Sequence, residues 1–186
     1  MSQTSEIIKR ELAAGERVLW TGQPKQGVFL RGADFLLIPF SLLWAGFAFF
    51  WEFQVFNTNA PIMFKLWGIP FMCVGVYIVF GRFLVEAKQR LKTHYAVTDK
   101  RIVIVSGLFT QNINSLNLRT LSDLSLSESG NGTGSIFFGG GSAMSFMYRG
   151  FSGWPGMSSR IGPHFQQITG ARAVYETIRT AQNETN

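Results

Sequence analysis

The chain has 186 residues, of which 46% are hydrophobic and only 15% are charged, and its formal net charge is +6. Soluble domains of this length usually carry more charge, so the composition disfavours an entirely soluble protein. Binding of nucleic acid is also disfavoured, because the Lys and Arg residues flank hydrophobic segments instead of forming one dense basic run. The single cysteine, Cys73, excludes an internal disulfide framework and a Cys-based zinc site, and we expect it to be a packed thiol.

The N-terminal segment, residues 1–33, is expected to contain one short helix and one short strand. Ser5 can cap a helix that runs from Glu6 to Ala14. In the strand that follows, Val18 and Trp20 share one face. Trp20 could stack on a ligand, but an aromatic side chain packed beside an amphipathic strand is the more common arrangement.

Residues 34–85 contain two uncharged hydrophobic segments, from Phe35 to Trp51 and from Leu66 to Gly81. Each is close to the length that crosses a bilayer, and the short connection allows only a tight turn, so the sequence predicts an antiparallel transmembrane hairpin. The prolines, Pro39 and Pro70, are expected in the first turns of their helices. Neither segment contains an ionisable residue, so an oligomeric transport or channel subunit is the weakest functional alternative.

Basic residues predict the orientation of this hairpin. They cluster before the first segment and after the second, and only Lys65 lies in the connection. By the positive-inside rule, both chain termini are expected in the cytoplasm. The flanking basic residues are Lys9, Arg10, Arg17, Lys25 and Arg31 on one side, and Arg82, Lys88, Arg90 and Lys92 on the other.

The C-terminal part, residues 86–186, has the pattern of a cytoplasmic α+β domain. Two β-rich runs meet at Asp99 and Lys100, which predicts a hairpin with a two-residue turn. Alternating patterns at Asn112 to Leu118 and at Leu121 to Leu126 indicate further strands. Helical spacing from Ile168 to Ala181 predicts a C-terminal helix.

Four segments, taken in this order, resemble the bacterial pleckstrin-homology-like small membrane proteins, which contain a PH domain. They are the runs GERVLWTGQP from Gly15, HYAVTDKRI from His94, GTGSI from Gly132 and AVYETI from Ala173. The resemblance covers most of the chain. It implies a multi-pass protein of the bacterial inner (plasma) membrane, with a strongly bent antiparallel sheet of seven strands, or partial barrel, closed by the C-terminal helix. It implies no reaction.

A glycine-rich stretch, Gly130 to Gly162, departs from that pattern and is expected to form a long irregular excursion between late strands. It is a candidate binding loop. Phe151 and Trp154 would insert into lipid or contact a partner, while Arg149 and Arg160 would bind phosphate or carboxylate groups. Alternatively, its aromatic side chains fold back on the domain.

Motifs for catalysis are missing. The sequence contains no phosphate-binding loop with Gly-Lys-Ser/Thr and no Gly-x-Ser-x-Gly elbow. His94, in a predicted strand, and His164, in a predicted turn, lack a carboxylate or second histidine at ligand spacing. We therefore expect no catalytic residue, no metal site and no cofactor.

The leading hypothesis is a non-enzymatic, membrane-anchored binding or scaffold module whose partner is another protein or a second copy of the chain. The alternative is recognition of anionic lipid headgroups by basic residues expected beside the inner leaflet. The candidate lipid-binding residues are Lys88, Arg90, Lys92, Lys100 and Arg101.

Overall fold

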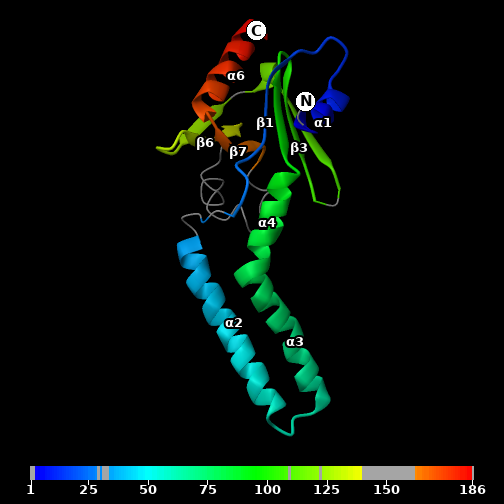
Figure 1. Cartoon of the computed structure of the whole chain (residues 1–186), viewed down its shortest axis with the longest axis vertical. Coiled ribbons are helices and arrows are strands. Elements are labelled where there is room, and N and C mark those ends of the chain that lie inside the picture. Colours follow the sequence, from blue (N-terminus) through cyan, green and yellow to red (C-terminus); the bar gives the residue numbers. More distant parts are fainter. Residues whose placement is uncertain are drawn as a thin grey trace.

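A computed structural model of the chain describes residues 3–28, 30, 34–108, 110–121, 123–139 and 162–185. It consists of a long helical hairpin and a mixed α+β domain, which lies entirely at one end of the hairpin (Figure 1). The predicted binding residues Arg149, Phe151, Trp154 and Arg160 lie outside the described residues.

The hairpin is formed by helix α2 (Asp34–Phe56) and by a second helix that runs continuously from Ile62 to Leu91. The second helix comprises α3 (Ile62–Val76), a π-helical turn (Tyr77–Gly81) and α4 (Arg82–Leu91). Both helices are long and apolar enough to cross a membrane, and only 22% and 17% of their most apolar windows are buried. Core helices of soluble proteins are mostly buried, so the exposure of these helices is compatible with a lipid environment.

Small residues line the contact between the two helices. Ser41, Ala45 and Ala48 are buried on α2, and Gly68 and Gly75 are buried on α3. A Cβ atom at Gly75 would lie 3.2 Å from Cα and Cβ of Ala45, so the two backbones approach closely there. Close approach of this kind is how membrane helices maximise van der Waals contact.

The helices are longer than predicted, and this changes which residues lie inside them. Helix α2 continues past Trp51 and includes Glu52, whose side chain is buried against Gly68. Helix α2 begins at Asp34 and α3 at Ile62, so Pro39 and Pro70 both lie inside their helices and not in the first turns as predicted. Cys73 is exposed on the hairpin surface, so the prediction of a packed thiol is wrong.

A buried ion pair joins the two helices at the end nearest the domain. Nη2 of Arg82 lies 3.0 Å from Oδ1 of Asp34, and both side chains are almost fully buried. The Arg82 guanidinium also lies over the ring of Phe83, with its Cζ 4.5 Å from the ring centroid. The ion pair connects the two helices where they enter the domain.

The described part of the domain contains two antiparallel sheets. One has the strand order β1-β2-β3-β4 and the other β5-β6-β7, in place of the single bent sheet expected from the resemblance, and they do not close a barrel. A backbone bond from Lys25 N to Gln167 O, 2.8 Å long, connects the chain after β1 to β7. The strands are β1 (Val18–Gly22), β2 (His94–Thr98), β3 (Arg101–Ser106), β4 (Asn112–Asn117), β5 (Leu124–Glu128), β6 (Thr133–Phe138) and β7 (His164–Thr169).

The domain core lies between the two sheets and helix α6 (Ala171–Thr185). Phe165 on β7 is at its centre, with ring centroids of Tyr95, Phe138 and Trp20 at 4.5, 4.9 and 5.6 Å. Trp20 is therefore a packing residue, as predicted. Helix α6 covers this core from the side of β5 and β6.

Helix α1 (Gln3–Glu11) packs against the other face of the four-stranded sheet. Its Ile8 is buried among Ala96, Val103 and Val105 of β2 and β3. The helix begins before the predicted start at Glu6 and ends before Ala14. Both faces of strands β2 and β3 are consequently covered, which explains why these strands are rich in apolar residues.

Two predictions near the C-terminus are wrong. His164 begins strand β7 and does not lie in a turn. The last helix begins at Ala171, because Ile168 belongs to β7 and Gly170 ends that strand with φ of 67°.

Candidate functional site

The basic residues that were predicted to form one lipid-facing surface lie at two opposite ends of the domain. Lys88 on α4 and Lys92 directly after α4 are exposed at the hairpin end of the domain. Lys100 and Arg101 follow β2, which runs away from α4, and the carbonyl of Asp99 accepts a 3.1 Å hydrogen bond from Thr185 at the far end of α6 (Figure 1). A strand of five residues spans about 17 Å, so these two pairs cannot meet the same headgroup layer.

Arg90 is buried and stabilises the junction between the hairpin and the domain. Its Nη1 donates to the carbonyl of Gly27 over 3.0 Å, and its guanidinium forms an ion pair with Glu86 one turn earlier in α4. Gln26 Nε2 donates to the Arg90 carbonyl at 3.4 Å. Arg90 therefore holds the chain segment after β1 against α4, and it is not placed to bind a lipid headgroup.

Arg101 also has an internal role. It forms hydrogen bonds of 2.9 and 3.0 Å with the two carboxylate oxygens of Glu16, which also accept bonds from Thr98 Oγ1 and Ala13 N. The hydrogen bonds from Arg101 lower the pKa of Glu16 to about 2, against the opposing effect of burial. The pair stays charged at neutral pH and fastens the segment between α1 and β1 to the β2–β3 turn.

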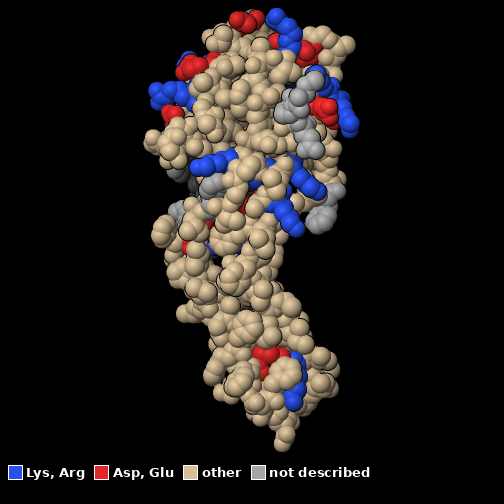
Figure 2. Space-filling model, viewed as in Figure 1, with Lys and Arg blue, Asp and Glu red and all other residues tan. Residues whose placement is uncertain are grey.

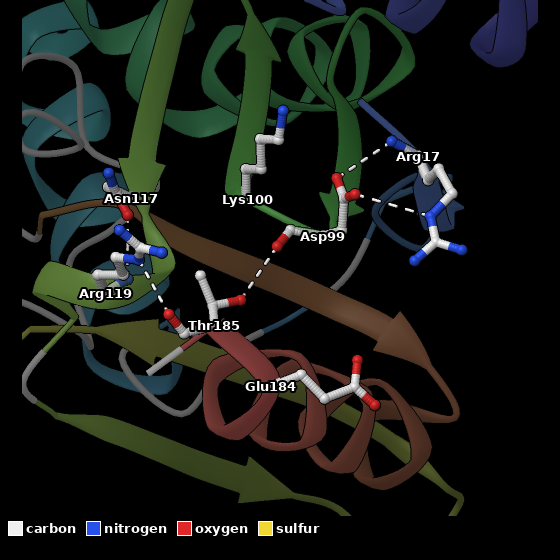
Figure 3. Close-up of a pocket in the computed structure, with 7 residues that line it drawn as sticks. All are labelled: Arg17, Asp99, Lys100, Asn117, Arg119, Glu184 and Thr185. Atoms are coloured by element: carbon white, nitrogen blue, oxygen red, sulfur yellow. Dashed lines mark hydrogen bonds and ion pairs between the residues drawn. The ribbon is translucent and has the colours of Figure 1, made fainter. Parts of the chain in front are cut away.

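A polar pocket of about 520 Å³ is lined by the β2–β3 turn and the last residues of α6, among others, and these elements end on the side of the domain opposite the hairpin (Figure 1). We call it the apical pocket. Four separate parts of the chain build it: the segment before β1, the β2–β3 turn, the end of β4 with the turn after it, and the end of α6 (Figure 3). Its lining residues are Arg17, Asp99, Lys100, Asn117, Arg119, Glu184 and Thr185.

Hydrogen bonds within the apical pocket hold some of its side chains in place. The Asp99 carboxylate accepts a 3.0 Å bond from Arg17 N, and its Oδ2 lies 3.7 Å from Arg17 Nε. Arg119 Nε donates to the carbonyl of Thr185 over 2.9 Å. Lys100 and Glu184 form no hydrogen bond or ion pair with the other residues drawn in Figure 3. The pocket thus offers one ammonium and one carboxylate that its own lining does not neutralise.

Of the predicted site residues that the structure describes, only Lys100 lines the apical pocket. The other lining residues were missed because they are far apart in the sequence and none belongs to a recognisable motif. The described residues contain no group of three or more His, Cys, Asp or Glu side chains that could hold a metal ion. The chemistry that the pocket can supply is ionic and hydrogen-bonding recognition of a polar ligand.

His94 is buried and connects α1 to the sheet. Its Nδ1 lies 2.9 Å from Nε2 of Gln23 and 3.2 Å from Oγ1 of Thr4. An amide nitrogen can only donate, so Nδ1 must accept, which requires that this nitrogen carry no proton. Burial lowers the pKa of His94 below its ordinary 6.5, in agreement with that neutral state.

We expect docking of α1 to weaken in acid. Because the pKa of His94 is lower in the fold than in the unfolded chain, its contribution is complete above about pH 6.5 and declines as the pH falls below that value. Protonated Nδ1 would also face the Gln23 amide donor. Amide hydrogen exchange of α1 should therefore accelerate on acidification, after correction for the intrinsic pH dependence of exchange.

Two histidine variants provide the controls for this pH effect. His94→Asn should remove most of the acid-dependent change in α1, whereas His164→Asn should keep it, because His164 lies on β7 and stacks on Phe137. If the protection of α1 has the same pH dependence in both variants, His94 does not control the docking.

Comparison of the chain with models of protein families, with curated proteins and with solved structures finds no match.

Proposed function

We propose that the protein is a non-enzymatic binding module of the bacterial inner membrane, with a PH-like domain that presents the apical pocket to the cytoplasm. The hairpin crosses the membrane, and both chain termini lie on the cytoplasmic side. The single observation that carries the proposal is that the pocket lies at the end of the domain farthest from the apolar hairpin.

Support for the membrane anchor comes from the distribution of exposed apolar and charged side chains. Large apolar residues are exposed along both hairpin helices, among them Phe35, Leu43 and Met63 at 81%, 73% and 74%. Figure 2 shows almost no charge along the hairpin except near its tip, and a band of Lys and Arg side chains where it joins the domain. An exposed apolar surface of this extent is unfavourable in water, and the basic band agrees with a cytoplasmic position of the junction.

The position of the apical pocket favours a soluble partner over a lipid of the same membrane. The polar headgroup layer is only about 5–8 Å thick on each side of a bilayer, whereas β2 alone spans about 17 Å from α4 to the pocket. Lipids that surround the hairpin therefore do not reach Lys100. A protein in the cytoplasm does.

The lining chemistry indicates the kind of segment that would bind. Lys100 would pair with an acidic side chain, and Asn117 and Arg119 would bond to backbone carbonyls or a second carboxylate. Glu184, beside them, disfavours a ligand that is acidic throughout. We infer that the partner contributes a short polar segment that carries at least one Asp or Glu.

Photo-crosslinking in cells tests this function. A photoreactive amino acid in place of Glu184, at the rim of the pocket, should capture one discrete protein, and the same probe at exposed Ser127 on β5 should not. Lys100→Glu should remove the adduct, whereas the matched reversal Lys88→Glu, next to the hairpin, should leave it. No adduct at position 184, or one that is insensitive to Lys100→Glu, would contradict the proposal.

The orientation has its own test. A phosphatase that is active only in the periplasm, fused after Asn186, should be inactive, and a cytoplasmic reporter at the same position should be active. The opposite result would place the apical pocket on the wrong side of the membrane for a cytoplasmic partner.

A further inference from the structure

The connection between β3 and β4 lies at the hairpin end of the domain. Its neighbouring residue pairs show this directly: Ile113 pairs with Val105, and Val105 pairs with His94, the first residue of β2 after α4. Lys92 Nζ, at the end of α4, donates to the carbonyl of Leu108 over 2.8 Å. In Figure 1, the ends of β3 and β4 that flank the connection lie near the last turns of α4.

Gly107, the first residue after β3, determines the backbone conformation at the start of this connection. Gly107 has φ of 142°, which side-chain-bearing residues rarely adopt, and a Cβ atom there would overlap the carbonyl of Thr110. The tight turn and the bond from Lys92 together fix Leu108 next to α4. Local contacts of Gly107 and Lys92 therefore determine where the start of the connection lies.

Among the described residues, five large apolar side chains are exposed outside the hairpin helices, and three of them lie at this end, beside Leu91, the last residue of α4, which is 59% exposed. Ile113 is one of the three and is 45% exposed although it lies in a strand. Val28 and Leu30, in the segment that leads into α2, are 57% and 63% exposed. Val18 and Leu19, at the start of β1, are the exceptions at the opposite end.

Basic side chains accompany the exposed apolar ones. Lys88 on α4 and Lys92 directly after it are both exposed. The ammonium group of Lys92 can donate three hydrogen bonds, and one of them goes to the carbonyl of Leu108. Apolar side chains at the level of the headgroups, combined with lysines that reach phosphate, are the combination that binds an anionic membrane surface.

We propose that the end of the domain beside the β3–β4 connection makes a second membrane contact, in which Ile113 and Lys92 rest on the anionic headgroup layer of the leaflet that holds the hairpin. This inference depends on the proposed membrane anchor. Its occupant is lipid, because the hairpin already brings the headgroups to this end of the domain and the basic charge complements them. The contact holds the domain in one orientation, with the apical pocket pointing away from the bilayer.

Site-specific fluorescence on the full chain tests the contact. In a Cys73→Ser background, an environment-sensitive label is attached at Ile113→Cys, at Leu19→Cys or at Leu43→Cys, and the protein is placed in nanodiscs that contain phosphatidylglycerol. Position 19 is the matched control, because Leu19 has nearly the same exposure, 43%, at the opposite end of the domain. Position 43 reports insertion of the hairpin, since Leu43 is exposed on α2.

Quenchers attached to the lipids should reach the labels differently. We expect headgroup-bound nitroxide to quench position 113 several-fold more than position 19, and nitroxide in the acyl chains to quench position 43. The double change Lys88→Glu and Lys92→Glu, high salt, or discs of phosphatidylcholine alone should reduce the quenching at 113 and leave that at 43 unchanged.

The outcomes separate this inference from the proposed function. If position 43 is quenched while positions 113 and 19 behave alike, the second contact is refuted and the anchor remains. If position 43 is not quenched, the anchor itself is refuted. Quenching at 113 that persists in neutral discs at full strength would overturn the role of the lysines.

Discussion

Replacing Phe165 by alanine is expected to lower the stability of the domain by about 3–5 kcal/mol, the cost of removing a large aromatic side chain from a closed core. Phe165 has no exposed surface and contacts Trp20, Tyr95 and Phe138, which come from three different strands. Its loss would leave a cavity where the two sheets meet. Hydrogen exchange of the β6 and β7 amides in the detergent-solubilised chain measures the effect.

Phe137 offers a control on the neighbouring strand. It is only half-buried and stacks on His164, at 5.3 Å between ring centroids, outside the central cluster. Phe137→Ala should therefore cost clearly less than Phe165→Ala. Similar losses of protection in the two variants would show that Phe165 is not the residue that joins the sheets.

Replacing Gly68 by valine is expected to destabilise the helical hairpin by about 1–3 kcal/mol, the usual cost of overpacking a filled interface. A Cβ atom at Gly68 would overlap the carboxylate of Glu52, which is 2% exposed and enclosed between α2 and α3. The helices must separate or the carboxylate must leave the interface. Unfolding in mixed micelles with increasing SDS, followed by circular dichroism, measures the change.

Gly46→Val is the matched control for this substitution. Gly46 also lies in an apolar hairpin helix, but nothing is within 4 Å of a Cβ atom built there. The two variants share the same change in helix propensity, so their difference isolates the contact with Glu52. Adding Glu52→Ala to Gly68→Val should restore part of the stability, and equal effects of the two glycine substitutions would contradict the packing that we describe.

The sequence predicted those elements whose pattern is local. The uncharged segments after Asp34 and Lys65 predicted two long helices, because the run of apolar side chains itself is the signal. The turn at Asp99 and Lys100 was predicted because two β-rich runs flank a two-residue connection. In both cases the pattern that predicts the element lies in residues that are close together in the sequence.

Strand β7 was missed because its buried residues do not alternate. Phe165 and Ile168 are both buried although they are three positions apart, a spacing that is typical of a helix. The pairing with β6 explains it: Ile136 pairs with Phe165 and Gly134 with Ile168, so β7 contains one extra residue. The irregularity contains Gln167, whose φ is 43°. Such a bulge depends on the partner strand, and the sequence of β7 alone does not contain it.

For the basic residues, too, the sequence predicted one part of their role and the tertiary structure decided the rest. Their positions along the chain established that charge flanks the apolar segments, and this determined the expected orientation of the hairpin. Only the tertiary structure decided their individual roles. It buries Arg90 at the junction, pairs Arg101 with Glu16, leaves Lys88 and Lys92 exposed beside the hairpin, and carries Lys100 to the opposite end.

By itself, then, the sequence determined the long apolar helices, the β-rich character of the C-terminal part and the charge around the hairpin, since each follows from composition and short-range periodicity. The tertiary structure alone decided the second sheet, the apical pocket and the burial of Glu52. These features arise where segments distant in the chain meet, as Arg17, Asp99 and Glu184 do in the pocket. Contacts of that kind are set by packing of the whole fold and leave no periodic trace in any one segment.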